Sequence, residues 1–167
     1  MISMIVAVDR SWGIGRNNDM LAHIEPDLEY FRNVTEGHTV IMGYNTYLSL
    51  PEENRPLPNR KNIVITRKNI KLEGVTIIDS IEETLDLINK EYKNEEVFIA
   101  GGESIYNQML PYADKLYITH IFRKFDDPQA FFPIIDDSWR IEDIKMSEEN
   151  IKHECPHIFA TYVKKEK

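Results

Sequence analysis

Residues suited to binding phosphate follow three of the strands that the sequence predicts. These strand ends are Met42-Gly43 with Thr46, Ile65-Thr66-Arg67, and Ala100-Gly101-Gly102. In open α/β sheets, ligands bind beyond the carboxyl ends of the strands, where bare backbone N–H groups after glycine donate to phosphate oxygens. An arginine past a strand can hold a terminal phosphate through two hydrogen bonds. A single Gly-Gly pair before a helix is more often a tight turn, but the three ends together favour a nucleotide site.

The common dinucleotide fingerprint is absent. G-x-G-x-x-G requires a helix directly after the glycines, whereas Gly13-Ile14-Gly15 leads into a segment that contains Asn17 and Asn18. A standard Rossmann half is therefore not expected.

A second candidate for chemistry is Asp27, near the start of a predicted helix. Asp27 shares a helical face with Phe31 and Val34, so its carboxylate points along an apolar stripe. One interpretation is a carboxylate satisfied by the first free N–H groups of the helix. The other is functional, because an ionised carboxylate facing an apolar cleft is costly without a partner. A heterocycle edge with two adjacent N–H donors would provide one.

The sequence lacks the residues that a disulfide, a zinc site or a nucleophilic catalyst would need. The lone Cys155 cannot form an internal disulfide, and Cys and His do not recur at zinc-ligand spacing, so we expect no metal and a reducing, cytoplasmic environment. No Ser or Cys stands in a nucleophile-like context near a histidine, so the sequence predicts no catalytic triad. The five histidines are His23, His38, His120, His153 and His157.

Composition excludes further classes. With 20 Lys plus Arg against 28 Asp plus Glu, the net charge of −8 disfavours a nucleic-acid surface. The apolar run from Met4 to Val8 is too short for a signal peptide or a membrane span. The 167 residues contain no repeat or long linker, so we expect one domain over residues 1–167, and a monomer.

The order of elements predicts an α/β fold. Strands alternate with helices over the first two thirds of the chain, which favours a mostly parallel sheet with helices on its faces, and a terminal strand pair adds an antiparallel edge. Residues 13–22 and 51–59 are expected to be loops. The expected strands are 2–8, 39–42, 62–66, 75–78, 97–100, 115–122, 139–145 and 157–163, and the expected helices are 26–35, 44–50, one through Ile81, Leu85, Ile88 and Tyr92, and 103–110.

Seven segments together resemble the bacterial dihydrofolate reductases, in order and over nearly the whole chain. The segments are Ile2-Ser3-Met4-Ile5-Val6-Ala7, Trp12-Gly13-Ile14-Gly15, Pro26-Asp27-Leu28-Glu29-Tyr30-Phe31, Val40-Ile41-Met42-Gly43 with Thr46, Arg55-Pro56-Leu57-Pro58-Asn59-Arg60-Lys61-Asn62-Ile63, Ala100-Gly101-Gly102, and Leu116-Tyr117-Ile118-Thr119-His120. The resemblance implies an eight-stranded mixed sheet with four helices, and hydride transfer from NADPH to 7,8-dihydrofolate. Two alternatives share this fold: a non-catalytic pterin- or nucleotide-binding module, and a riboflavin-pathway pyrimidine reductase.

The resemblance also implies roles in the folate site. Asp27 would hold the 2-amino group and N3 of the pterin, while water protonates N5, and Thr119 would support the carboxylate. Arg60 would bind the α-carboxylate of the glutamate tail, with Arg55 nearby. The cleft that takes dihydrofolate, or antifolate inhibitors, would be lined by Ile5, Ala7, Leu28, Phe31, Leu50, Leu57 and Ala100.

For the cofactor, the resemblance implies a lid over the nicotinamide at residues 13–22 and a cis Gly101-Gly102 bond. The residues expected to contact NADPH are Ala7, Gly13, Ile14, Gly15, Asn18, Asp19, Met20, Gly43, Tyr44, Asn45, Thr46, Thr66, Arg67, Ala100, Gly101, Gly102, Glu103, Ser104, Ile105, Tyr106 and Gln108.

The chain departs from the family pattern at four places. Ala22 replaces the usual tryptophan of the lid, and Pro128-Gln129 replaces a Gly-Asp pair that contacts the closed lid. Tyr44 and Ser104 stand where basic residues are frequent, which leaves Arg67 as the clearest cation for the 2′-phosphate of NADPH.

Overall fold

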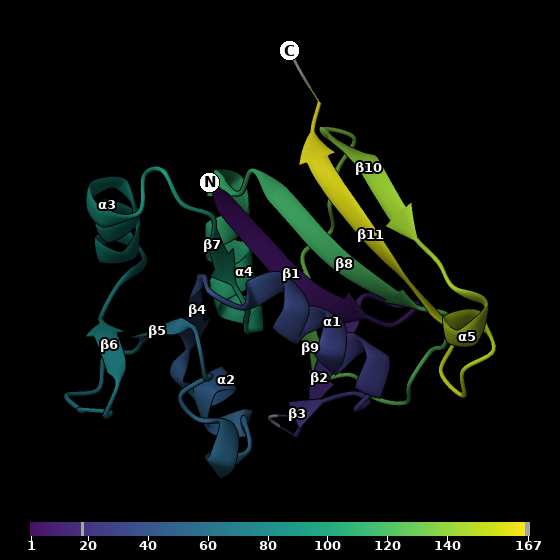
Figure 1. The fold of residues 1–167 in the computed structure, drawn as a ribbon, viewed down its shortest axis with the longest axis horizontal. Coiled ribbons are helices and arrows are strands. Elements are labelled where there is room, and N and C mark those ends of the chain that lie inside the picture. The colour runs from purple at the N-terminus through teal and green to yellow at the C-terminus, as the bar shows by residue number, and fades with distance from the viewer. Residues whose placement is uncertain (18, 166–167) are drawn as a thin grey trace.

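An eight-stranded mixed sheet forms the centre of the computed structural model, which describes residues 1–17 and 19–165 (Figure 1). The strand order is β10-β11-β8-β1-β7-β4-β5-β6, with β11 antiparallel to both of its neighbours and the remaining pairs parallel. The strands are β1 (Ile2–Val8), β4 (Thr39–Gly43), β5 (Lys61–Ile65), β6 (Val75–Ile78), β7 (Val97–Ile99), β8 (Lys115–Ile121), β10 (Trp139–Lys145) and β11 (His157–Lys164).

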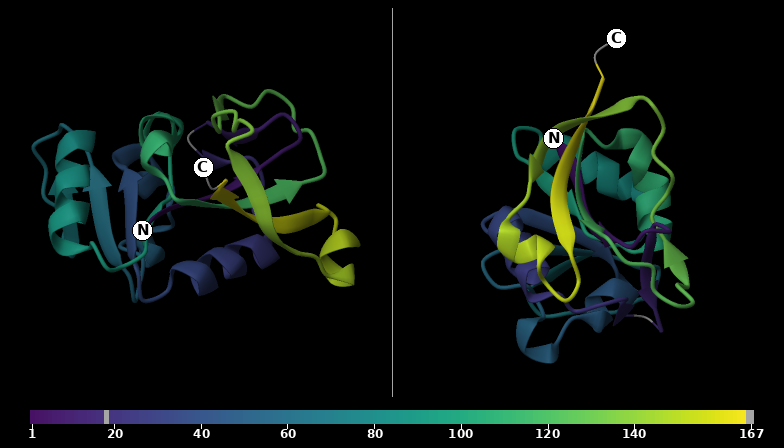
Figure 2. Two further views of the ribbon diagram at one scale, coloured as in Figure 1. Left: turned by 90° about the horizontal axis from the view of Figure 1, so that it is seen from above. Right: turned by 90° about the vertical axis from the view of Figure 1, so that its right-hand side faces the viewer.

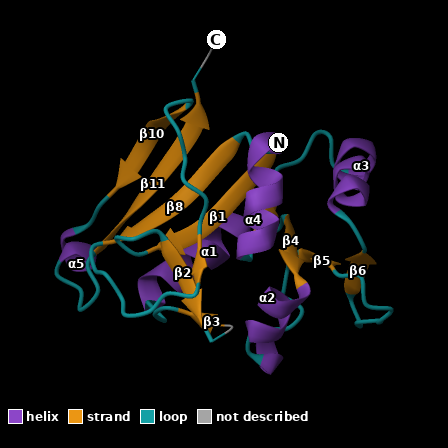
Figure 3. Cartoon of the chain, turned by 180° about the vertical axis from the view of Figure 1, so that it is seen from behind, coloured by secondary structure: helices purple, strands orange, loops and turns teal. Residues whose placement is uncertain are grey.

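Helices cover both faces of this sheet. Helix α1 lies on one face and α4 on the other, as the views from above and from behind show (Figures 2 and 3). The side chain of Ser80 caps α3 by accepting from Glu83 N at 3.1 Å, and Pro26 starts the first turn of α1. The helices are α1 (Glu25–Thr35), α2 (Tyr44–Ser49), α3 (Ile81–Glu91), α4 (Glu103–Met109) and α5 (Glu148–Ile151), with 3₁₀ turns at Glu52–Asn54 and Leu110–Tyr112.

Strand alternation divides the buried apolar residues into two cores. Met4 and Val6 of β1 pack with Tyr106 and Met109 of α4, whereas Ile5 belongs to the core on the α1 face. The two-residue period of a strand produces this division, because successive side chains point to opposite faces. The sheet therefore fixes α1 and α4 on either side of the carboxyl end of β1.

The structure corrects three expectations. Residues 13–22 are not a loop throughout: β2 (Gly13–Arg16) and β3 (Asp19–Met20) form a hairpin, and β9 (Ala130–Phe131) extends it to three strands. The glycines of that segment suggested an irregular chain, whereas Gly13 and Gly15 both lie in β2 and pair with β9. The expected count of four helices is one too few, because Ser147 accepts from Asn150 N and starts the short helix α5. The loop expected at 51–59 contains one of the two 3₁₀ turns.

The remaining elements are confirmed. All eight predicted strands of the central sheet and all four predicted helices are present, and their ends agree with the predicted ends to within one residue. The predicted antiparallel pair at the end of the chain is also confirmed, as β10 and β11.

Candidate active site

A cleft of about 1120 Å³ lies at the carboxyl ends of β1, β4 and β7, bordered by α1 and by the hairpin β2–β3. The ends of these strands contribute Ala7, Gly43 and Ala100. This is the edge at which parallel sheets bind ligands. Most residues predicted for either ligand line this one cleft: Ile5, Ala7, Gly13, Ile14, Gly15, Asp19, Met20, Asp27, Leu28, Phe31, Gly43, Tyr44, Asn45, Thr46, Leu50, Leu57, Arg60, Ala100, Gly101, Gly102, Glu103, Ser104, Ile105 and Tyr106.

Asp27 is the carboxylate of the apolar half of the cleft. It lies in the first turn of α1, and its Oδ1 accepts a 2.6 Å hydrogen bond from Thr119 Oγ1 of β8. Burial raises the pKa of Asp27 above its usual value, and the Thr119 hydroxyl and the His157 side chain oppose that rise. The structure thus places a partly desolvated acid, held by one hydroxyl, at the wall of the cleft.

Apolar side chains surround this carboxylate. Ile5 and Leu57 are buried, and Phe31 and Leu50 pack against the same core. Leu28 lines the cleft but is 41% exposed, which leaves apolar surface for a ligand to cover. The wall suits a flat ring system with a polar edge directed at Asp27.

Arg60 is fixed at the opposite part of the cleft by two neighbours. Its Nε donates to Pro58 O at 2.9 Å, and its Nη1 donates to the hydroxyl of Thr35 at 3.2 Å. Thr35 is fully buried, and its hydroxyl in turn donates to Phe31 O. Burial lowers the pKa of Arg60, yet a guanidinium stays charged at neutral pH. The free edge of Arg60 can therefore bind a carboxylate.

The Pro-rich segment that carries Leu57 and Arg60 is held by Asn62. The buried carboxamide of Asn62 accepts from Leu57 N and donates to the carbonyl oxygens of Leu57 and Arg60, at 2.9 to 3.0 Å. Because this segment has no strand pairing of its own, the carboxamide replaces the missing backbone partners. No pattern in the sequence identified Asn62 or Thr35 as supports of the site.

Three glycines form the floor of the other half of the cleft. Gly43 N donates to Gly101 O at 2.9 Å, and the Gly101-Gly102 bond is cis, as expected. A Cβ on Gly102 would lie 3.2 Å from Thr46 Oγ1, and Gly101 has a φ of +118° that side chains disfavour. The bare backbone therefore forms a cradle into which phosphate groups fit.

Five of the predicted site residues do not line the cleft. Thr119 lies behind Asp27 and reaches the site through its hydrogen bond. The guanidinium of Arg55 donates to Leu48 O at 3.1 Å and pairs with Glu52 at 3.6 Å, so it supports the end of α2 instead. The other three are Thr66, Arg67 and Gln108. Asn18 falls outside the described residues.

Lys68 is a cation that the sequence analysis missed. Its Nζ lies 5.4 Å from the centre of the Tyr44 ring, and Tyr44 lines the cleft. The ammonium therefore reaches the place where Tyr44 replaces a basic residue. No local pattern distinguishes Lys68 from a surface lysine, because the contact depends on how the end of β5 lies beside α2.

Further lining residues also escaped the sequence analysis. Several are polar side chains of the hairpin, of the residues between the hairpin and α1, of α1 itself and of the segment before β9, where the sequence shows only a solvated surface. Examples are Arg16, Asn17, His23, Glu29, Arg32 and Gln129. Ala22, which replaces the usual tryptophan, lines the cleft as well.

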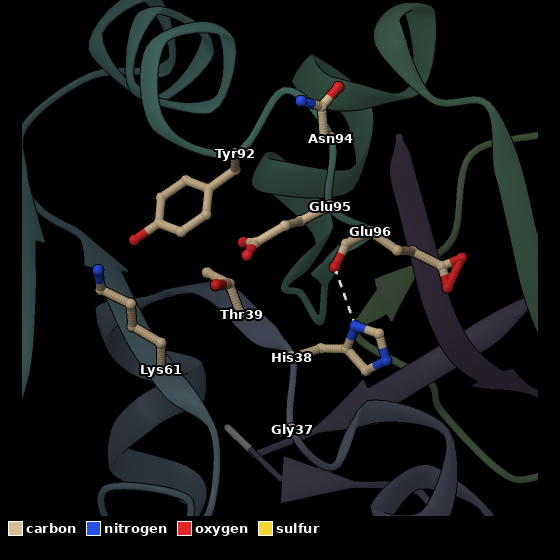
Figure 4. A pocket seen from close by; sticks show the side chains of 8 residues that line it. All are labelled: Gly37, His38, Thr39, Lys61, Tyr92, Asn94, Glu95 and Glu96. Carbon is tan, nitrogen blue, oxygen red and sulfur yellow. Dashed lines mark hydrogen bonds between the residues drawn. The ribbon is translucent and has the colours of Figure 1, made fainter.

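A second cavity, of about 570 Å³, lies at the opposite edge of the sheet (Figure 4). His38 and Lys61 line it at the amino ends of β4 and β5, and His38 Nδ1 lies 3.2 Å from Glu96 O. None of the residues predicted to do chemistry lines this cavity. Over residues 1–17 and 19–165, no three His, Cys, Asp or Glu side chains are grouped to hold a metal ion. In the same described part of the chain, no helix combines the length and apolarity needed to cross a membrane.

Comparisons with known proteins agree with this geometry. The family model described as "Dihydrofolate reductase" matches residues 1–164. The dihydrofolate reductase of Bacillus subtilis is 37% identical over 99% of this chain and 95% of its own length, and that of Staphylococcus haemolyticus is 39% identical over 96% and 94%. A solved structure of the Enterococcus faecalis enzyme, complexed with NADP(H) and RAB-propyl, superimposes with a TM-score of 0.88 at 30% identity, over 99% of this chain and 97% of that one. The chain belongs to the dihydrofolate reductase family.

Proposed function

We propose that the protein reduces 7,8-dihydrofolate to tetrahydrofolate at this cleft, with NADPH as the cofactor that supplies the hydride. The observation that carries the proposal is the Asp27 carboxylate, which a hydroxyl from β8 holds in an apolar wall beside a glycine cradle. Such a carboxylate can accept hydrogen bonds from the 2-amino group and N3 of a pterin.

The substrate half of the cleft matches the parts of dihydrofolate. Phe31, Leu50 and Leu57 would enclose the ring and the benzoyl group, and Arg60 would bind the α-carboxylate of the glutamate tail. Asp27 would keep the pterin oriented while water delivers a proton to N5. In the riboflavin-pathway reductase, a pyrimidine substrate without a glutamate tail would leave Arg60 without a partner.

The cofactor half suits a dinucleotide phosphate. Gly43, Gly101 and Gly102 present bare backbone to a pyrophosphate, and the E. faecalis relative was solved with NADP(H). Arg67 and Lys68 follow β5 and would supply positive charge for the 2′-phosphate, and the Lys68 ammonium lies over the Tyr44 ring. The hairpin β2–β3 would cover the nicotinamide and exclude water.

Four further proposals complete the assignment. Residues 1–167 would act as one domain, which the continuous sheet from β10 to β6 supports, and the protein would be a monomer. The lone Cys155 supports a cytoplasmic location. Antifolate inhibitors would compete for the Asp27 half of the cleft.

Steady-state oxidation of NADPH by purified protein, with and without dihydrofolate, tests this assignment. Turnover that requires both compounds supports it. Tight folate binding without turnover would instead support the non-catalytic module.

A further inference from the structure

Asp9 is a buried carboxylate outside the cleft. It directly follows β1, is 3% exposed, and does not line the cleft. A buried charge requires several hydrogen bonds to offset its desolvation. The partners of Asp9 show what this carboxylate holds in place.

The two oxygens of Asp9 bind two different segments of the chain. Oδ1 accepts from Ser11 N at 2.9 Å, Ser11 Oγ at 2.8 Å and Gly13 N at 2.8 Å, so it holds the base of the hairpin β2–β3. Oδ2 accepts from Phe125 N at 3.0 Å, in the segment between β8 and β9. Burial acts to raise the pKa of Asp9, but these four bonds lower it below the usual value, so the carboxylate is ionised at neutral pH.

The backbone at the hairpin base is strained. Trp12 has a φ of +65°, a left-handed conformation that residues with a side chain seldom adopt. Such a conformation persists only where neighbours determine it, and here Trp12 N donates to Asp9 O while Asp9 N donates to Gly13 O, each at 3.0 Å. The turn at Trp12 sets the direction in which β2 leaves the sheet toward the cleft.

The segment bound by Oδ2 also contacts the rest of the hairpin. Pro128 packs on Gly13 so closely that a Cβ on Gly13 would lie 2.7 Å from Pro128 Cβ. Farther along, Gln129 Oε1 accepts from Asn17 N and Gln129 N donates to Gly15 O, both at 2.8 Å. Residues 125–129 therefore hold the hairpin along its length, and Asp9 joins that segment to the hairpin base.

We propose that Asp9 is a positioning residue for hydride transfer, which holds the base of the hairpin β2–β3 in place beside the cleft by binding Gly13 and Phe125 at once. Asp9 touches neither ligand and acts through Gly13 and Phe125. This inference rests on the proposed function for its kinetic consequence, but not for its structural one.

The substitution Asp9→Asn separates the two links. An asparagine has one carbonyl oxygen, which would stay with the three donors at Ser11 and Gly13, and its amide group would face Phe125 N, donor against donor. The matched control is Asp136→Asn, because exposed Asp136 accepts from Ser138 N and Ser138 Oγ in the same Asp-x-Ser arrangement, before β10. The control shares the local motif but lacks the link to the hairpin.

Two measurements on these variants test the proposal. Asp9→Asn should slow single-turnover hydride transfer by about 10-fold or more, since small misplacements of reacting groups are costly. Its KM for dihydrofolate should change by less than about 3-fold, because the Asp27 half of the cleft is untouched. Asp136→Asn should leave both constants unchanged. Equal rates for Asp9→Asn and wild type, or a KM effect without a rate effect, would overturn the proposal.

Amide hydrogen exchange in the unmodified protein keeps the proposal testable if Asp9→Asn does not fold. The amides of Ser11, Gly13 and Phe125 share one carboxylate, so they should exchange with one common free energy of opening, below that of global unfolding. Unrelated opening free energies at Gly13 and Phe125 would contradict the link. An inactive wild type with matched exchange would refute the proposed function and leave the link intact.

Discussion

Thr119 Oγ1 and Asp27 Oδ1 lie 2.6 Å apart, although 92 residues separate them in the chain. The bond joins β8 to the first turn of α1, and it is the polar contact that orients the carboxylate in an apolar wall. Because the hydroxyl donates to the ionised carboxylate, it opposes the rise in pKa that burial imposes on Asp27. Orientation and ionisation of Asp27 therefore depend on the same neighbour.

Asp27→Asn should reduce turnover at neutral pH by about 10²-fold or more, because the carboxylate that orients the pterin ring for hydride transfer is lost. The amide cannot accept hydrogen bonds from both pterin N–H groups. Binding of NADPH should stay within about 3-fold of wild type, because the glycine cradle is distant from this change. Steady-state kinetics and cofactor titration measure both effects, and undiminished turnover would exclude Asp27 from the mechanism.

The same substitution should stabilise the protein above the folded-state pKa of Asp27. A carboxyl group whose pKa rises on folding contributes stability that is fully present below about pH 3.8 and is lost as pH rises through the folded-state pKa. Asp27→Asn should consequently raise the thermal midpoint at pH 7 relative to wild type, and the gain should vanish at low pH. Exposed Asp137→Asn is the control. A lower midpoint at pH 7 would show that ionised Asp27 is stabilising.

Thr119→Val keeps the shape of the side chain and removes the hydrogen bond to Asp27. The pKa of Asp27 should rise further, because the opposing hydroxyl is lost, and the pH profile of kcat/KM should move to higher pH. Thr119→Ser retains the donor and should restore the wild-type profile. If Thr119→Val and Thr119→Ser give the same pH profile of kcat/KM, the hydroxyl does not set the ionisation of Asp27.

Arg60→Ala should weaken the binding of folates that carry a glutamate tail and leave the binding of pterins without one unchanged. A charge-assisted hydrogen bond contributes about 1.5 to 3 kcal/mol, which corresponds to roughly 10- to 150-fold in Kd. Arg55→Ala is the matched control, since the Arg55 guanidinium is bound to Leu48 O and does not line the cleft. Calorimetric titration with both ligands gives the Kd of each for wild type and variant. An equal loss of affinity for the two ligands would refute the role of Arg60.

Arg67→Ala and Lys68→Ala should each narrow the preference for NADPH over NADH. Both cations follow β5, and the ammonium of Lys68 lies over Tyr44 at the cleft. Each loss should reduce the ratio of kcat/KM values by about 10-fold or more, in line with one charged contact to phosphate. Lys71→Ala, on the same exposed segment, is the control. A ratio that is unchanged in both variants would place the 2′-phosphate elsewhere.

Local sequence patterns predicted the central sheet well, because periodicity and turn residues act over short distances. Pro26 and the acidic first turn identified α1, and Gly43 marked the end of β4. The hairpin β2–β3 was missed for the opposite reason. Its strands are short, β2 contains two glycines, and the second partner of β2 is β9, more than a hundred residues away.

Residues of the site could be predicted from the sequence where the residue type and its context allow only one role. Asp27 was identified from its apolar helix face, and Arg60 from the family motif. Thr35, Asn62 and Asp9 act by hydrogen-bonding parts of the backbone or side chains that the fold brings to them. Their sequence contexts are those of ordinary helix, strand and turn residues, so no local signal marks them. Arg55 is the opposite case. Its motif predicts a contact with the substrate, whereas in the structure its guanidinium binds the backbone of α2 at Leu48 O.

The most direct test of the central claim is the rate of NADPH oxidation by wild type and Asp27→Asn, side by side, with dihydrofolate present and absent. Turnover by wild type is expected only when both compounds are present, and the variant should lose about 10²-fold or more of that turnover at neutral pH. Equal turnover by the two proteins, or oxidation that is independent of dihydrofolate, would contradict it.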